Sequence, residues 1–376
     1  MADLKTILRE LSVIIGYVFA QLSIIKYELT PTEFIELILK YCSNSIDFPS
    51  EIDKINKESF TSAENAIIRN GIELGKLIYE NIAIEGKILW LGPINRNDYP
   101  SDISIGNIQI SLKEESFILK NPSFAEYLNA LVTPKEPFKT IHVFRKFAKT
   151  EFEKWFVYTF TKLKATSAGK DNIIYSYTKN QNKYNIKKTN SGISFEDNSR
   201  SYLLIDDKTI TEEYFNQMIP GDIIEHTFSK WVKDKLEKND KEYIKLKKIC
   251  SETAGRNLIN FIEENKNINS NRFLEILQIF DNDYYYAKND GKKISLYKVP
   301  KKSDCVLSIK EMHFTVPKSQ LNVFFTFEIS IKIKSDVKSE EIIMHVECRY
   351  SHGQFKGIPE AKLYCKDDLS KLYLLM

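Results

Sequence analysis

The stretch Asp102-Ile-Ser-Ile-Gly-Asn-Ile-Gln-Ile-Ser-Leu-Lys113 decides the fold expected for this chain. Apolar and polar residues alternate on both sides of its central Gly-Asn step, which is typical of a β-hairpin closed by a two-residue turn. Closing that turn places Asp102 opposite Ser111. The isoleucines and the leucine then share one face, which we expect to lie in a core, and the polar side chains share the other face.

The polar face of this hairpin carries the residue types of a cation site. Opposed side chains of an antiparallel pair lie about 5 Å apart and diagonal ones about 7–8 Å apart. Asp102 is therefore expected beside the Ser111 hydroxyl, with the Lys113 ammonium on the diagonal. A carboxylate with an ammonium nearby is a plausible arrangement for a divalent cation beside a phosphate.

Length and composition set broad limits. A chain of 376 residues suggests two or three domains, and 43% hydrophobic residues are enough for a sizeable core. The formal net charge is only +3. This charge is compatible with nucleic-acid binding but does not argue for it, because basic residues matter only where they cluster on one face.

Several classes of site are not indicated. The five cysteines include no CxxC pair, and the five histidines lack HxH or HxxxH spacing, so we expect reduced thiols, no zinc centre and a cytoplasmic protein. The chain contains no GxxxxGK[ST] motif for ATP and no GxSxG motif for a serine hydrolase.

The apolar segment 11–25 allows two interpretations. Lys5 and Arg9 precede it, as in a signal peptide, but Asp3 and Glu10 spoil the basic region and no clean cleavage site follows. It is also too short to span a bilayer. We therefore expect a buried amphipathic helix here and no membrane association.

The remaining pattern divides the chain into a mixed part and a β-rich part. Helices are expected in two pieces within residues 1–45, and then over 62–79, 123–131, 151–163, 211–217, 225–237, 242–265 and 272–280. Strands are expected at 87–91, in the hairpin, weakly over 165–200, and at 322–333 and 341–350. This change of character predicts one domain over 1–270 and a mainly β domain over 271–376.

The run Ser101-Asp102…Ile110-Ser-Leu-Lys113-Glu-Glu-Ser116, followed by Asn121-Pro-Ser123, resembles the active-site hairpin of PD-(D/E)xK nucleases, in particular type II restriction endonucleases. Asp102 and Lys113 match the family pattern, whereas Ser111 stands where the pattern has an acidic residue. The resemblance covers about residues 60–140. It implies an α/β (α+β) fold: a restriction-endonuclease-like core with a central mixed sheet flanked by helices, followed by the mainly β C-terminal domain.

The resemblance also implies roles for the hairpin residues. Mg²⁺ takes oxygen ligands, so Asp102 would be the anchoring ligand and the Leu112 backbone carbonyl a second one. Lys113 would orient the attacking water or stabilise the charged phosphate. Ser111 would be a weak outer contact.

A second carboxylate must then come from elsewhere. Glu64 is the first candidate because it begins the helix before the sheet, although an acid at that position equally suits the helix dipole. Glu115 competes with it, since it shares a strand face with Ser111 and Lys113, and Glu73 is a third candidate.

Two basic segments are candidates for DNA contacts. Arg145, Lys146 and Lys149 follow soon after the hairpin and would touch the DNA backbone. Arg349, His352 and Gln354 would read base edges or grip phosphates, unless that segment is an ordinary strand and turn.

The resemblance therefore implies a Mg²⁺-dependent type II site-specific deoxyribonuclease that cleaves double-stranded DNA in a restriction system. A homodimer and a cognate DNA methyltransferase are the expected partners. Two alternatives stay open. The chain could be a structure-specific or repair nuclease of the same superfamily, or a non-catalytic DNA- or protein-binding module in which the hairpin is structural.

Overall fold

The structure is a computed structural model that describes residues 3–92, 101–113, 122–205, 210–289, 293–333, 336–350, 353–365 and 374–375. The main helices are α1 (Leu4–Gln21), α2 (Pro31–Tyr41), α3 (Pro49–Asp53), α4 (Ser62–Asn81), α5 (Phe124–Val132), α6 (Val143–Phe147), α7 (Lys149–Ala165), α8 (Glu212–Met218), α9 (Gly221–His226), α10 (Phe228–Trp231), α11 (Lys241–Glu264) and α12 (Ser270–Ile276). A π-helical segment, Val232–Glu237, continues α10.

A six-stranded mixed sheet holds the hairpin. Its strands are, in spatial order, β1 (Ile88–Trp90), β2 (Ile103–Ile105), β3 (Ile108–Lys113), β8 (Tyr284–Asn289), β9 (Ile294–Val299) and β14 (Leu374–Leu375). The pairs β1–β2 and β2–β3 are antiparallel, whereas β3 is parallel to β8. Gly106 begins the β2–β3 turn at φ +57°, a conformation that favours glycine.

Helices α1 and α4 cover one face of this sheet and form one core with the isoleucines of the hairpin. The two helices approach closely at Gly16 and Gly75. A Cβ on Gly75 would lie 2.1 Å from the Val13 carbonyl oxygen, so only glycine allows this packing. Segment 11–21, the larger part of the apolar stretch, is thus a packed helix, and none of the helices in the described ranges is long and apolar enough to cross a membrane.

The β-rich C-terminal region is a separate antiparallel sheet. It consists of β10 (Cys305–Thr315), β11 (Leu321–Ile333), β12 (Asp336–Arg349) and β13 (Glu360–Cys365), in that order. Its apolar face packs on α11 and α12 within a second, larger core. The other face of the hairpin sheet joins that core through Tyr284 and Tyr286.

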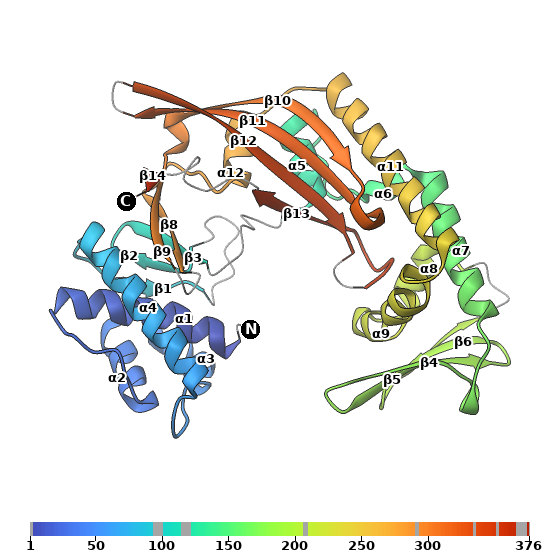
Figure 1. Cartoon of the computed structure of the whole chain (residues 1–376), viewed down its shortest axis with the longest axis horizontal. Coiled ribbons are helices and arrows are strands. Elements are labelled where there is room, and N and C mark those ends of the chain that lie inside the picture. Colours follow the sequence, from blue (N-terminus) through green and yellow to red (C-terminus); the bar gives the residue numbers. More distant parts are fainter. Residues whose placement is uncertain are drawn as a thin grey trace.

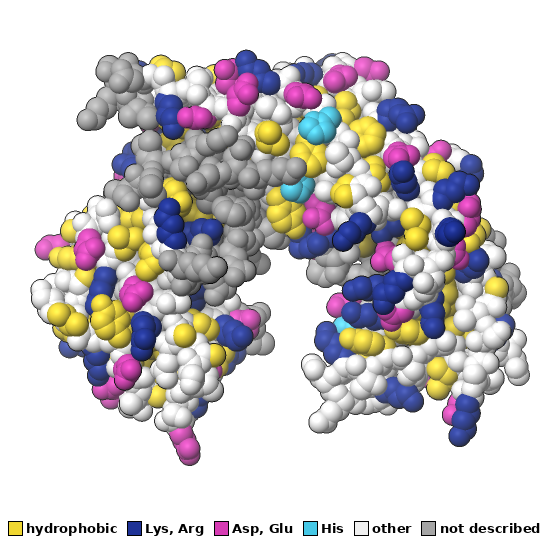
Figure 2. Space-filling view, in the orientation of Figure 1, with side chains coloured by type: hydrophobic (Ala, Val, Ile, Leu, Met, Phe, Trp, Pro, Cys, Tyr) yellow, Lys and Arg dark blue, Asp and Glu magenta, His cyan; other side chains and the backbone are white. Residues whose placement is uncertain are grey.

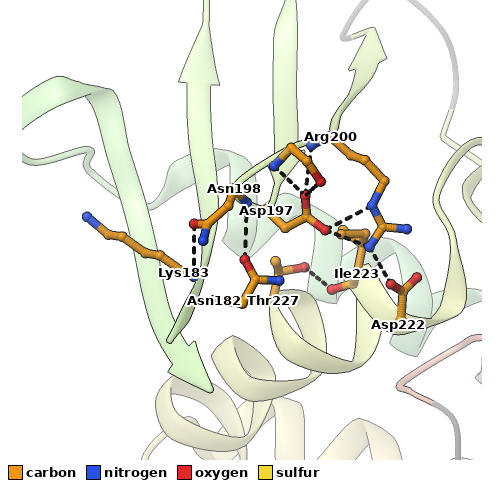
Figure 3. Close-up of polar contacts among 9 residues, drawn as sticks. Asn182, Lys183, Asp197, Asn198, Arg200, Asp222, Ile223 and Thr227 are labelled. Carbon is orange, nitrogen blue, oxygen red and sulfur yellow. Dashed lines mark hydrogen bonds and ion pairs between the residues drawn. The ribbon is translucent and has the colours of Figure 1, made fainter. Parts of the chain in front are cut away.

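A third sheet occupies residues that showed only weak strand character. It contains β4 (Ile173–Lys179), β5 (Asn182–Thr189), β6 (Gly192–Glu196) and β7 (Ser201–Ile205). The Arg200 guanidinium ties its β6–β7 turn to α9, because it pairs at 2.5 Å with both Asp197 and Asp222 (Figure 3). These charge-assisted bonds hold the pKa of Asp197 well below its usual value, at about 2.

The expected class, a central mixed sheet flanked by helices with a β-rich C-terminal region, is confirmed. The boundary expected at 270/271 does not coincide with the sheets. Strands β8, β9 and β14, all beyond residue 270, complete the sheet begun by β1–β3, and β4–β7 form their own sheet before it. Periodicity marks a strand but not its partner, so the sequence could not assign β8 and β9 to the hairpin.

Figure 1 shows these parts arranged as an arch. The lobe with α1–α4 and the hairpin sheet forms one side, the lobe with α7–α9 and β4–β6 forms the other, and β10–β12 run across between them. The space-filling view shows a wide open recess between the two lobes (Figure 2).

Candidate active site

The hairpin forms in the expected register. Ile103 pairs with Ile110 and Ser104 with Gln109, so Asp102, just before β2, faces Ser111 on β3. The Asp102 backbone N–H donates to the Ile110 carbonyl at 2.9 Å and continues the ladder by one step. This confirms the predicted juxtaposition of Asp102 and Ser111.

The Asp102 carboxylate is held where the ladder ends. Its Oδ2 accepts the Leu112 backbone N–H at 2.5 Å and lies 3.4 Å from Ser111 Oγ, a weaker contact. The N–H and C=O of one strand residue point to the same side of the strand. The Leu112 carbonyl therefore points toward the Asp102 side of β3, which places two oxygen donors at one end of the hairpin.

The surroundings of Ser111 are dry. Ser111 is fully buried, and the buried Tyr284 phenol on β8 lies close to both Ser111 and Asp102. Burial raises the pKa of Tyr284 far above its usual range, so this phenol stays neutral and can only add a dipole to the site. Asp102 itself is partly exposed.

Lys113 ends β3, two residues beyond Ser111. Its backbone pairs with Lys288 of β8, which brings two lysine positions next to each other on parallel strands. The Lys113 side chain and the whole of Glu115 lie outside the described residues. The role of Lys113 therefore stays a prediction.

Glu64 has a structural role at the start of α4. Its carboxylate Oε2 accepts the Thr61 backbone N–H at 2.8 Å, which completes a capping box, and pairs with Lys57 at 2.5 Å. These contacts lower the pKa of Glu64, the Lys57 bond most of all. The carboxylate therefore serves the helix end, in line with the helix-dipole interpretation.

Glu73 lies on an exposed part of α4. It lines a shallow surface pocket together with Ile25, Lys26, Tyr27, Glu28 and Arg69. The hairpin sheet covers the opposite, apolar side of this helix. Glu73 is thus wrongly placed to complete a site at Asp102.

The structure brings a different carboxylate, Glu10, to the edge of the hairpin. Glu10 is 4% exposed in the middle of α1, and its Oε2 accepts the Trp90 indole N–H at 2.7 Å. The same oxygen lies against Gly92, where a Cβ would meet it at 2.0 Å. The Gly92 backbone N–H in turn donates to the Asp102 carbonyl at 3.1 Å.

Gly92 thus lies in space between the Glu10 carboxylate and the Asp102 backbone. Motif spacing does not single out Glu10, but the sequence does hold a signal for it: an acid on the apolar side of a helix must find a partner in the core. Figure 1 shows α1 beneath the strands that carry the hairpin.

The first predicted DNA-binding segment is partly engaged within the protein. The Arg145 Nε donates to the buried Glu212 carboxylate at 2.6 Å, next to His142. The Lys146 ammonium lies over three aromatic rings, the nearest being Phe138 at 4.9 Å. Lys149 is exposed at the start of α7, and its contact with DNA stays a prediction.

The second predicted segment lies in the other lobe. Arg349 ends β12 and is paired with Glu347 at 3.2 Å, and Gln354 follows on a loop beside α10. His352 lies outside the described residues. Arg349 and Gln354 line a pocket of about 370 Å³ together with residues of α7, α10 and α11.

Across the described ranges, no three His, Cys, Asp or Glu side chains are grouped closely enough to form a metal cage. Mg²⁺ needs fewer protein ligands than that, because it binds through one or two carboxylates with waters and phosphate. The oxygen donors at the hairpin end suit this mode. Comparisons with protein-family models, curated proteins and solved structures find no match to the chain.

Proposed function

We propose that this chain is a Mg²⁺-dependent endonuclease that hydrolyses double-stranded DNA at the end of the β2–β3 hairpin. The observation that carries the proposal is the Asp102 carboxylate, oriented by the Leu112 N–H beside the Leu112 carbonyl at a partly exposed strand end. Oxygen donors of this kind suit Mg²⁺. The bound ion would neutralise phosphate charge and lower the pKa of a water.

The chain's own residues would do the positioning. Asp102 would bind the metal ion through its carboxylate. The hydrogen bond from Leu112 and the weaker contact with Ser111 would restrict the rotation of that carboxylate. Lys113, on the same strand and two residues beyond Ser111, would place a positive charge beside the phosphate that is attacked. The fully buried Ser111 would orient Asp102 and make no contact with DNA.

Glu10 would supply the second carboxylate. Its carboxylate lies beside Gly92, whose backbone N–H donates to the Asp102 backbone carbonyl, and it accepts the indole N–H of a fully buried tryptophan. We assign to Glu10 the role first expected of Glu64, since the Glu64 carboxylate is used in the capping box of α4.

The finer assignment rests on the resemblance and on the shape of the molecule. The strand order β1-β2-β3 antiparallel, then β8 parallel to β3, supports a restriction-endonuclease-like core with the hairpin near its centre. The open recess beside this lobe would admit the DNA (Figure 2). Lys149 is an exposed cation at the start of α7 and would be a candidate for contact with it. We propose type II restriction as the activity.

Digestion of a supercoiled plasmid of known sequence tests the proposal. The wild-type chain should give discrete, reproducible fragments with Mg²⁺ and none with a chelator. Asp102→Ala and Lys113→Ala should abolish cleavage while retaining DNA binding, and Asp53→Asn, a change of an exposed acid in α3, should leave it intact.

Each other outcome has a definite meaning. Random nicking would indicate a structure-specific or repair nuclease. Cleavage that survives both Asp102→Ala and Lys113→Ala would reject the site. An absence of any Mg²⁺-dependent cleavage across many plasmids would favour the non-catalytic binding module.

A further inference from the structure

A second pocket lies in the lobe opposite the hairpin, and the proposed hydrolysis does not use it. Its volume is about 370 Å³, within the range of small-molecule sites. It is formed where α10 and the π-helical segment meet α7, α11 and the loop after β12. π-helical turns are rare and are found frequently at functional sites.

The lining of this pocket is cationic. Lys230, Lys233, Lys247 and Arg349 line it, against two carboxylates, Glu225 and Glu237. Glu237 is already paired with Lys247 at 2.6 Å. The Arg349 guanidinium is paired with Glu347 at 3.2 Å. Lys230 and Lys233 face one further carboxylate of the wall, Glu225, so the lining keeps a small excess of positive charge, which suits a phosphate group.

The pocket wall also includes a side-chain amide. The Gln354 side-chain Nε2 is buried and makes no hydrogen bond within the described part of the chain. It belongs to a residue of the pocket wall.

The pocket wall is preorganised. The Gln354 backbone N–H donates to Ser229 Oγ at 2.6 Å, which fixes the loop against α10. Gly353, at φ +114°, lets that loop approach closely, because a Cβ there would lie 3.0 Å from Ile224 Cγ2. The aromatic side chains of Phe144, Trp155 and Tyr350 complete the wall.

We infer that this pocket binds a mononucleotide, either free or as the 5′-phosphorylated end of a DNA strand. The cations would hold the phosphate, and the aromatic wall would hold the base. The choice of an anion follows from the pocket itself. The choice of a nucleotide rests on the proposed function.

Calorimetric titration of the full chain in EDTA tests this inference without any need for catalysis. 2′-Deoxyadenosine 5′-monophosphate should bind with a dissociation constant below about 1 mM, and deoxyadenosine and inorganic phosphate should each bind at least about tenfold more weakly. A 5′-phosphorylated hexanucleotide, compared with its 5′-hydroxyl form, distinguishes a strand end from a free nucleotide.

Lys233→Gln and Arg349→Gln should each weaken binding of the monophosphate about tenfold. Lys245→Gln is the matched control, because Lys245 lies on α11 but does not line the pocket. Unchanged affinity in both pocket variants, or no binding of the monophosphate by the wild-type chain, would overturn the inference. Asp102→Ala should bind the monophosphate normally, so loss of cleavage and loss of this site are separable.

Discussion

Two substitutions of Glu10 separate its structural role from its proposed catalytic one. Its carboxylate is 4% exposed and accepts the indole N–H of Trp90, which is fully buried, at 2.7 Å. Glu10→Leu removes the acceptor and leaves the indole N–H unpaired in the core. An unsatisfied buried donor costs about 1–3 kcal/mol. Part of that cost is offset because a buried charge is removed as well. We expect a net loss of about 2 kcal/mol.

Glu10→Gln keeps an acceptor oxygen in the same place and removes only the charge. A neutral hydrogen bond is about half as strong as a charge-assisted one, so the loss of stability should stay below about 1 kcal/mol. If Glu10 helps to hold the metal, however, cleavage should fall at least about tenfold and should require more Mg²⁺. Glu10→Gln is therefore expected to lose cleavage while nearly keeping its stability, whereas Glu10→Leu is expected to lose stability.

Urea unfolding measures the first quantity and plasmid cleavage over a range of Mg²⁺ concentrations the second. Glu36→Gln is the matched control, since Glu36 is exposed on α2. Wild-type cleavage by Glu10→Gln would refute the second carboxylate and leave Glu10 as a partner of Trp90. Wild-type stability of Glu10→Leu would refute the energetic argument.

Three further predictions concern the scaffold. Gly75→Ala should lower stability by at least about 3 kcal/mol in a thermal melt, because its Cβ would collide with the α1 backbone; a melt like that of the wild type would contradict the close helix approach. Gly106→Ala should cost about 1 kcal/mol, because its φ is +57°, and an unchanged urea midpoint would count against that turn. Asp197→Asn should cost about 2 kcal/mol at pH 7 in urea unfolding. The pKa of Asp197 is depressed in the folded state, so its contribution to the free energy of unfolding is present above the ordinary pKa of 3.8 and is lost as the pH falls toward 2. The difference in stability between the wild type and Asp197→Asn should therefore shrink below about pH 4. A difference that is constant with pH would refute the Asp197–Arg200 pair.

Local features of the sequence determined the secondary structure well. The alternation around Gly106-Asn107 specified the hairpin and its register, because a two-residue turn fixes which residues face each other. Helix starts were also local, since capping pairs such as Thr61 with Glu64 lie three residues apart. Asp102 beside Ser111 followed directly from these short-range rules.

Long-range packing decided which strands pair, which helices pack together and which charged side chains meet. Strand β8 lies beside β3 although more than 170 residues separate Ser111 from Tyr284. The alternation of apolar and polar residues in one strand does not indicate which other strand it pairs with. The same applies to Glu10, which reaches the hairpin only because Gly16 and Gly75 let α1 pack against α4. It applies also to Arg145, whose half-exposed side chain is paired with the buried Glu212 carboxylate.

The chain by itself therefore set the hairpin and placed Asp102 opposite Ser111, because turns, caps and alternation act over a few residues. The tertiary structure decided which carboxylates are buried or paired and which cations remain exposed, because burial and pairing depend on neighbours that are remote along the chain.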